Sequence, residues 1–169
     1  MVKFFLVYGV LLLVYNYYLQ HYDAARNEVD GFTVIVATQT KELLSFFDVD
    51  AMITADPFAP SVRLFIQKYY IAKIVEGCNA ISIMILFAAF IIAFSGRWYK
   101  TVVFIVFGIL GIHCFNILRI ALLGIALYRY PEYTNMLHGV VFPLAIYGAV
   151  FLLWYLWIAK FSDFAGDGK

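Results

Sequence analysis

The stretch TVVFIVFGILGIHCFNILRIALLGIALY, residues 101–128, decides the fold class of this chain. Arg119 is the one side chain in it that carries a fixed charge, and about 20 apolar residues are enough for a helix to cross a bilayer. The whole chain is similar in character, with 64% hydrophobic and 14% charged residues and a mean hydropathy of +0.87. A soluble domain is about half apolar and a quarter charged. The sequence therefore predicts an integral membrane protein.

Three further apolar stretches flank this one, and together they predict an all-α membrane domain over residues 1–169 with four transmembrane helices. The expected spans cover about residues 4–19, 79–95, 101–128 and 138–159. The first span resembles a signal peptide, but bulky residues follow it where a cleavage site needs small ones, so we expect a retained anchor. Residues 21–77 form one long loop. Within it, residues 32–47 have helical spacing and predict a helix on the membrane surface, and 62–75 allows a short strand or hairpin.

Positive charges set the expected orientation. The short connection 96–100 carries two cationic side chains and no acid, and lysines flank the other two ends on that side (Arg97, Lys100, Lys3, Lys160). The long loop carries five basic and eight acidic residues. By the positive-inside rule, both termini and the 96–100 connection face the cytoplasm, and residues 21–77 and 129–137 face outward.

Several kinds of function find no support in the composition. The net charge is +1 without a basic cluster, which argues against nucleic acid as a partner. Cys78 and Cys114 do not form a CxxC pair, so a thiol oxidoreductase is disfavoured. No group of His, Cys and carboxylate residues has the spacing of metal ligands, and we expect neither a metal nor a cofactor.

Three chemically reactive residues are expected at one level of the membrane. Cys78 opens the second span, His138 opens the fourth, and Arg119 lies about 20 residues beyond the inner end of the third, near the outer boundary. A thiolate attacks carbonyl carbon, a histidine transfers protons, and an arginine stabilises an oxyanion. Asn116 shares a helix face with Arg119 and is expected to hold it in place. The trio suits attack on a peptide bond through a thioester.

These residues resemble a known family, the exosortases and archaeosortases, and in particular the short form called exosortase F. The resemblance covers residues 76–157 and is carried by EGCNAI (76–81), NILR (116–119) and HG (138–139). It implies that Cys78 is the nucleophile, Arg119 the stabilising arginine and His138 the acid or base. Many relatives have about twice as many spans, and the longer forms usually have a small residue where this chain has Asn79.

The resemblance also implies a substrate and a place in the cell. Exosortases act on exported proteins that end in a sorting signal, made of a short motif, a transmembrane helix and a basic cluster. The expected activity is that of a cysteine protease or transpeptidase in a bacterial inner membrane, with the active site facing the periplasm. The partners are then these protein substrates and the lipid bilayer. Whether the short form also needs a small accessory membrane protein stays open.

A second class of function stays open beside this one. Cys78 could be a packing residue at a helix end, Arg119 could reach the lipid headgroups, and His138 could cap the fourth span. The chain would then be a non-catalytic membrane subunit of an export or assembly complex. Substitution of Cys78 separates the two classes, because a scaffold tolerates it and an enzyme does not.

Overall fold

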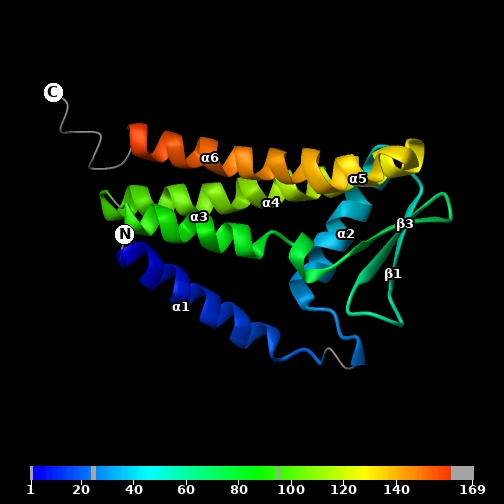
Figure 1. The fold of residues 1–169 in the computed structure, drawn as a ribbon, viewed down its shortest axis with the longest axis horizontal. Coiled ribbons are helices and arrows are strands. Elements are labelled where there is room, and N and C mark those ends of the chain that lie inside the picture. Colours follow the sequence, from blue (N-terminus) through cyan, green and yellow to red (C-terminus); the bar gives the residue numbers. More distant parts are fainter. Residues whose placement is uncertain (1, 24–25, 95, 161–169) are drawn as a thin grey trace. The chain divides into compact units, whose positions relative to one another are not determined.

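The computed structural model describes residues 2–23, 26–94 and 96–160, except for the side chain of His138. Figure 1 shows helices along most of the chain and one small sheet. The elements follow in the order α1 (Val2–Leu19), α2 (Gly31–Phe46), β1 (Ala51–Ala55), β2 (Val62–Ile66), β3 (Tyr69–Ile74), η2 (Glu76–Cys78), α3 (Ile81–Ala93), α4 (Trp98–Arg129), η3 (Pro131–Tyr133), α5 (Thr134–Met136), η4 (Leu137–Val141) and α6 (Phe142–Lys160). The predicted cytoplasmic position of the C-terminal end concerns residues 161–169, which lie outside the described residues.

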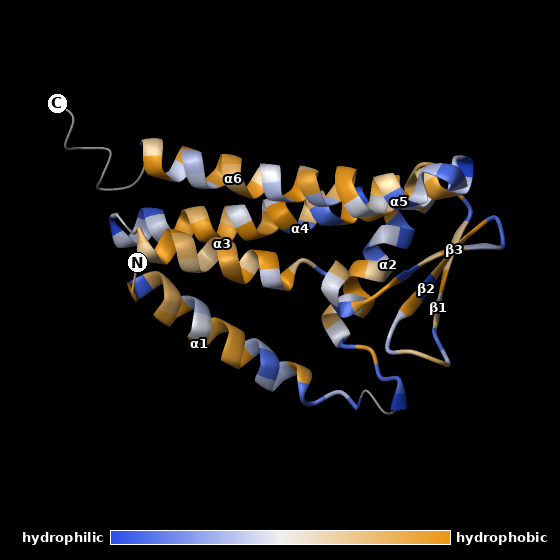
Figure 2. Ribbon diagram, in the orientation of Figure 1, coloured by the Kyte–Doolittle hydropathy of each residue, from blue (hydrophilic) through white to orange (hydrophobic). Residues whose placement is uncertain are grey.

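Three helical segments are long and apolar enough to cross a membrane. They are Val2–Leu19, Trp98–Arg129 and Pro131–Lys160, and they correspond to the first, third and fourth predicted spans. Their apolar character is clear in Figure 2, and large apolar side chains such as Phe5, Phe107 and Phe151 are exposed on them. The predicted span 79–95 contains only the 13-residue α3. At about 1.5 Å per residue it is roughly 20 Å long, less than the hydrocarbon core of about 30 Å. A fourth span therefore remains a prediction.

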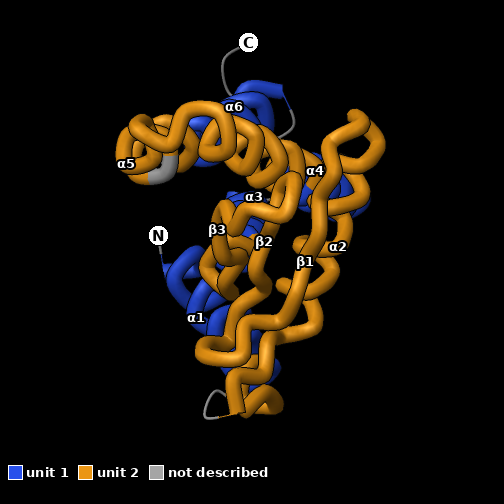
Figure 3. Tube along the Cα trace, turned by 90° about the vertical axis from the view of Figure 1, so that its right-hand side faces the viewer, with its two compact units in different colours: residues 1–18, 80–113, 145–169 blue, residues 19–79, 114–144 orange. Residues whose placement is uncertain are grey.

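The chain divides into two compact units, coloured separately in Figure 3. The first comprises residues 1–18, 80–113 and 145–169, and ring contacts fill its interior. Phe104 of α4 lies 6.1 Å from the ring of Phe87 of α3 and 4.9 Å from that of Trp157 of α6. The Trp157 indole donates a hydrogen bond of 2.8 Å to the carbonyl of Phe94. Gly108 leaves the room that the Phe87 ring occupies, because a Cβ there would overlap it. Close approach of α3 and α4 therefore depends on this glycine.

The second unit, residues 19–79 and 114–144, contains the sheet and corrects the predicted all-α class. Its strands are antiparallel in the order β1-β2-β3. Alternate residues of β2 are buried, as expected for a strand covered on one face. That face packs against α2 and the second half of α4, through the apolar side chains Val36, Ala37, Leu44, Val62, Leu64, Ile66, Ile74, Ile120 and Ala121. β2 and β3 form the short strand or hairpin that the sequence allowed over residues 62–75, whereas β1, which has five residues, was not expected.

Helix α2 confirms the helix expected over residues 32–47, but its buried side chains have another partner. Val36 and Ala37 are fully buried beneath the sheet, whereas Ile35 and Phe46 are exposed. The helix begins at Asp30, whose carboxylate accepts a hydrogen bond of 2.9 Å from the Thr33 amide. Part of the pattern that predicted contact with the membrane surface is therefore the packing face for the sheet.

The two hairpins have different kinds of turn. Gln67 and Lys68 connect β2 to β3 with φ of 49° and 69°, values that favour Gly or Asn. The Gln67 side chain accepts a hydrogen bond of 2.5 Å from the Tyr128 hydroxyl of α4, which holds this turn in place. Because the turn residues are Gln67 and Lys68, the sequence lacks the Asn-Gly or Asp-Gly pair that usually identifies such a hairpin.

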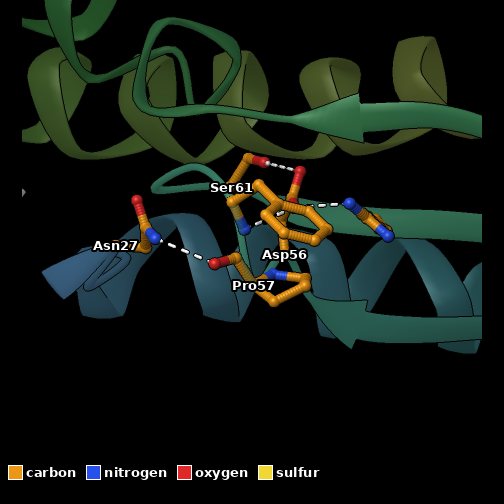
Figure 4. A network of polar contacts seen from close by, with 6 residues as sticks. Asn27, Asp56, Pro57 and Ser61 are labelled. Carbon is orange, nitrogen blue, oxygen red and sulfur yellow. Dashed lines mark hydrogen bonds and ion pairs between the residues drawn. The ribbon is translucent and has the colours of Figure 1, made fainter.

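The turn between β1 and β2 is organised by the carboxylate of Asp56, shown in Figure 4. Asp56 accepts hydrogen bonds from the Phe58 amide at 3.0 Å, the Ser61 hydroxyl at 3.1 Å and the Arg63 guanidinium at 2.6 Å. The Phe58 amide and then Arg63 hold the pKa of this carboxyl below its ordinary value. The Asn27 side chain donates to the Pro57 carbonyl at 2.9 Å and ties the preceding segment to the same turn.

Candidate active site

Cys78 lies at the end of a tight turn that joins β3 to α3. The amides of Cys78 and Asn79 donate to the carbonyls of Val75 and Glu76, at 2.8 and 3.1 Å, and close one 3-10 turn. Ala80 then adopts φ 65°, a left-handed conformation that is uncommon for a residue other than glycine. Such conformations persist only where the surrounding structure imposes them, and they occur often at functional sites. Cys78 is a free, half-buried thiol.

Two buried asparagines fix this turn to two different helices. Asn116 of α4 donates a hydrogen bond of 2.8 Å to the carbonyl of Cys78, and Asn79 donates one of 3.1 Å to the Thr33 hydroxyl of α2. Each asparagine is 1% exposed. Buried polar groups of this kind are costly unless they are paired. The pairing therefore holds the backbone of the cysteine between two helices of the same unit.

Asn116 makes a contact that the sequence did not indicate. Its side-chain amide donates to the Cys78 carbonyl, 38 positions away. The i,i+3 relationship brings neighbours on one helix together, but it gives no information about a loop that packs against that helix. The expected role of Asn116 in holding Arg119 stays a prediction, and the structure adds a direct contact between Asn116 and the backbone of the cysteine.

Cys78 and Arg119 line the same cavity, which lies within the second unit. The cavity has a volume of about 210 Å³. Besides these two residues it is lined by β2, β3, α4 and α5, through Leu64, Ile71, Ala72, Lys73, Ile74, Ile120, Leu123, Gly124, Leu127 and Thr134. The sequence predicted that the Cys78 thiol and the Arg119 guanidinium lie at one level. The structure places both residues on the wall of one cavity, and their joint role stays a prediction. The sequence did not indicate the apolar walls that the sheet supplies.

The charged side chains on the cavity wall are both cationic. Arg119 and Lys73 line it, and no Asp or Glu stands beside them on the described wall. The Nε atom of Arg119 is buried, while Lys73 is exposed. Positive charge with few competing carboxylates would stabilise an oxyanion that forms in the cavity.

The segment that contains His138 contributes Thr134 to the cavity wall. From Thr134 the helical chain continues through α5 into the π-helix η4, which contains His138. Short π-helical segments are rare and occur often at functional sites. The imidazole itself lies outside the described residues, so its predicted role stays a prediction. His113 and Cys114, the other polar residues of this part of α4, are absent from the cavity wall.

Sequence reasoning missed the contact between Asn79 and Thr33. Asn79 stood out only as a polar residue at the start of an apolar stretch, and Thr33 is 46 positions earlier in the chain. The buried hydrogen bond to Thr33 is a structural reason for an asparagine at position 79, where longer relatives usually have a small residue. The described residues hold no cluster of three or more potential metal ligands.

Comparison with known proteins identifies the family of this chain. No curated protein and no solved structure matches the chain. The family model of the transmembrane exosortases matches residues 3–160. That range extends beyond residues 76–157, over α1, α2 and the whole sheet. The chain therefore belongs to the transmembrane exosortase family.

Proposed function

We propose that this protein is a cysteine protease or transpeptidase that cleaves the C-terminal sorting signals of exported, membrane-anchored proteins. The observation that carries the proposal is the shared cavity, which Cys78 and Arg119 both line. Membership of the exosortase family supports the same class of reaction. The hydrogen bond from Asn116 to the Cys78 carbonyl adds support, because it fixes the nucleophile's backbone one helical turn from Arg119.

The proposed reaction has two acyl-transfer steps. The Cys78 thiolate attacks the carbonyl carbon of the substrate peptide bond, and Arg119 stabilises the negative charge that develops on the carbonyl oxygen. The C–N bond breaks, the leaving amine takes a proton from His138, and a thioester on Cys78 remains. An acceptor nucleophile then attacks the thioester, gives up its proton to His138 and releases the Cys78 thiolate. Water in place of the acceptor gives hydrolysis.

The membrane arrangement proposed for this reaction follows the charges of the loops. α1, α4, α6 and the shorter α3 form four spans, and both termini lie in the cytoplasm. The second unit then faces the periplasm of a bacterium with an inner membrane. A substrate held by its own transmembrane helix would bring its cleavage motif to the outer level, where Cys78 lies.

A pair of cysteine variants tests the proposal. Cells that make the wild-type chain, Cys78→Ala, Cys78→Ser or Cys114→Ser are compared by mass spectrometry of the C-terminal peptides of exported proteins. We expect new C-termini with the wild type and with Cys114→Ser, since Cys114 is an exposed thiol outside the cavity. Both Cys78 variants should lose them. Hydroxylamine should release an acyl group from wild-type Cys78 and none from Cys114.

The opposite outcome has a definite meaning. If Cys78→Ser and Cys78→Ala retain the processed C-termini at wild-type levels, Cys78 is not the nucleophile. A non-catalytic membrane subunit would then account for the cavity and for the family membership. Equal expression of all four chains in the membrane is the required control.

A further inference from the structure

The strand that leads to Cys78 has a free edge. The sheet order is β1-β2-β3, so β3 pairs with β2 on one side and with no strand of the described chain on the other. Residues Val75 to Cys78 continue directly from it into the turn of the thiol. A free strand edge presents backbone donors and acceptors that can pair with an extended peptide.

The cavity reaches this edge. Ile71, Ala72, Lys73 and Ile74 are consecutive and all line it. Successive side chains of a strand point to opposite faces, so a cavity on one face would be lined by alternate residues. Ala72 and Ile74 lie opposite Leu64 and Val62, whereas Lys73 lies opposite Arg63 on the other face. Four consecutive lining residues therefore indicate that the cavity extends around the edge of β3.

The length of edge available for pairing is short. The register between β2 and β3 is irregular between Leu64 and Phe65, and Ile71 is the extra residue on β3. Bulges and edge lysines also protect strands from uncontrolled pairing, and β3 has both. The regular part that remains is residues 72–74, immediately before the turn of Cys78. This edge therefore suits a segment of a few residues next to the bond that is cut, and not a long strand.

The opposite wall of the cavity is apolar. Leu123, Gly124 and Leu127 of α4 face it beyond Arg119, one or two helical turns further along. The volume of about 210 Å³ exceeds the roughly 150 Å³ of an apolar cavity that holds a benzene ring. An aliphatic or aromatic side chain fits such a space, and burial of leucine there should favour binding by about tenfold to hundredfold over alanine.

We propose that the substrate segment next to the cut bond binds as an added strand on the free edge of β3, with an apolar side chain in the cavity between β3 and α4. The cavity wall contains Cys78 and Arg119, so a peptide on this edge presents its carbonyl to both. This inference rests on the proposed function, and names how that site takes its substrate. Gly124 lines the cavity beside Leu64, so a side chain added at this position should reduce the room for the apolar side chain.

The test uses the full-length chain in nanodiscs and peptidyl electrophiles that alkylate a thiol. The probes are acetyl-Ala-Ala-Ala-Xaa chloromethyl ketones with Xaa as Ala, Leu, Phe or Asp, and a second series with Xaa one position earlier. The second-order rate of Cys78 labelling is measured by mass spectrometry. In one of the two series we expect Leu to react at least about tenfold faster than Ala and Asp slower than both.

Backbone pairing is tested with the wild-type chain alone. Each amide nitrogen of the best probe is methylated in turn, which removes one donor. In an added strand, alternate amides point toward the partner. We therefore expect methylation to slow labelling at every second position, by about tenfold, and to have little effect at the positions between.

Two glycines of α4 provide a matched pair of variants. A Cβ at Gly124 would lie 3.2 Å from Leu64 Cδ2 and 3.6 Å from Ile66 Cδ1, whereas a Cβ at Gly111 would meet nothing within 4 Å. Gly124→Leu should reverse the preference, so that the Ala probe reacts faster than the Leu probe. Gly111→Leu should retain the wild-type order.

The outcomes separate this inference from the proposed function. Fast, Arg119-dependent labelling of Cys78 without apolar preference and without alternation in the methylation series overturns the edge-binding inference and leaves the nucleophile in place. Labelling of Cys78 by every peptidyl probe at the rate of chloroacetamide, a probe without a peptide, contradicts the proposed function itself. A Gly124→Leu chain that fails to fold does not affect the methylation test, which uses the wild type.

Discussion

Apolar packing is common to both compact units of this chain, and the second unit adds another kind of contact, the hydrogen bonds of buried asparagines. In residues 1–18, 80–113 and 145–169 the interior consists of rings and aliphatic side chains, as in the stack of Phe90 on Trp154 with centroids 4.4 Å apart. In residues 19–79 and 114–144, buried side-chain hydrogen bonds join segments far apart in sequence, such as Asn116 to Cys78 and Asn79 to Thr33. The first kind tolerates changes that preserve volume. The second requires particular atoms at particular places.

This difference fits a division of labour between the units. Apolar packing is sufficient to hold helices together in lipid, where shape and small residues decide how closely they approach. A site that transfers acyl groups needs its nucleophile fixed to within a fraction of an ångström. Substitutions should therefore separate into those that change stability and those that change the rate per folded molecule.

The largest effect on rate among the variants that keep Cys78 is expected for Arg119→Ala. Loss of the guanidinium removes the charge that would stabilise the oxyanion, and the processing rate should fall by about 10²- to 10³-fold. Arg119→Lys should recover only part of it, since lysine cannot present two donors in a fixed plane. Processed C-termini of exported proteins are quantified at equal membrane levels of each chain. A rate for Arg119→Ala within a factor of two of the wild type would remove Arg119 from the site.

Asn116→Leu should reduce both stability and rate. The Cys78 carbonyl would lose its buried donor, which costs about 1–3 kcal/mol of unfolding free energy, and the displaced thiol should react about tenfold to hundredfold more slowly. The readouts are thermal unfolding in detergent and the labelling rate of Cys78 by a peptidyl chloromethyl ketone. Asn116→Gln can still donate and is the partial-rescue control. If labelling is unchanged while stability falls, Asn116 only supports the fold.

Gly108→Ala provides the contrast from the first unit. Its methyl group would overlap the Phe87 ring, so α3 and α4 must separate or the ring must rotate, at a cost of about 1–3 kcal/mol. The processing rate per folded molecule should be unchanged, since no residue of this contact lines the cavity. Gly111→Ala on the same helix meets nothing and should have no effect on stability. A lower rate per folded Gly108→Ala chain would show that the units do not act separately.

The sequence drew attention to Cys78 and Arg119 but gave little indication of the scaffold around them. Counting residues along the span from 101 placed Arg119 near the level of Cys78, because helix rise and bilayer thickness are fixed lengths. The structure places both residues on the wall of one cavity, and their shared role in catalysis stays a prediction. The predicted span 79–95 is longer than the helix found there. Ala80 adopts a turn conformation, and α3 begins only at Ile81.

The sequence allowed a hairpin within residues 62–75, which β2 and β3 form, but it did not indicate β1 or the complete sheet. β1 is five residues long, and the tight turn at Gln67 and Lys68 lacks the glycine or asparagine that identifies such hairpins. Long-range pairs such as Asn79 with Thr33 depend on how the sheet and α2 pack, and a single sequence gives no direct signal of them. The sequence therefore indicated the candidate reactive residues and Asn116, but not the pairing of Asn79 with Thr33.

Acidification should weaken the second unit selectively at the turn between β1 and β2. The pKa of Asp56 is lowered in the folded chain, so the ionised carboxylate contributes stability that is fully present above the unfolded pKa of about 4 and is lost as the pH falls through the folded value. Hydrogen exchange of residues 51–66, corrected for the intrinsic effect of pH, should accelerate below about pH 4. Asp56→Asn should exchange faster at pH 7 and depend less on pH. Equal profiles for both chains would exclude the carboxylate as the cause.

The smallest effect is expected at Lys68, where removal of a side chain should stabilise the unit. Lys68 has φ 69°, a conformation that costs a residue with a Cβ about 1 kcal/mol and that glycine adopts freely. Lys68→Gly should therefore raise the unfolding free energy by up to about 1 kcal/mol, although glycine also gains entropy in the unfolded chain. Lys41→Gly, inside α2, is the matched control and should lower it by a similar amount. Opposite signs for the same replacement in one unit would show that backbone conformation, and not the loss of a positive charge, decides the result.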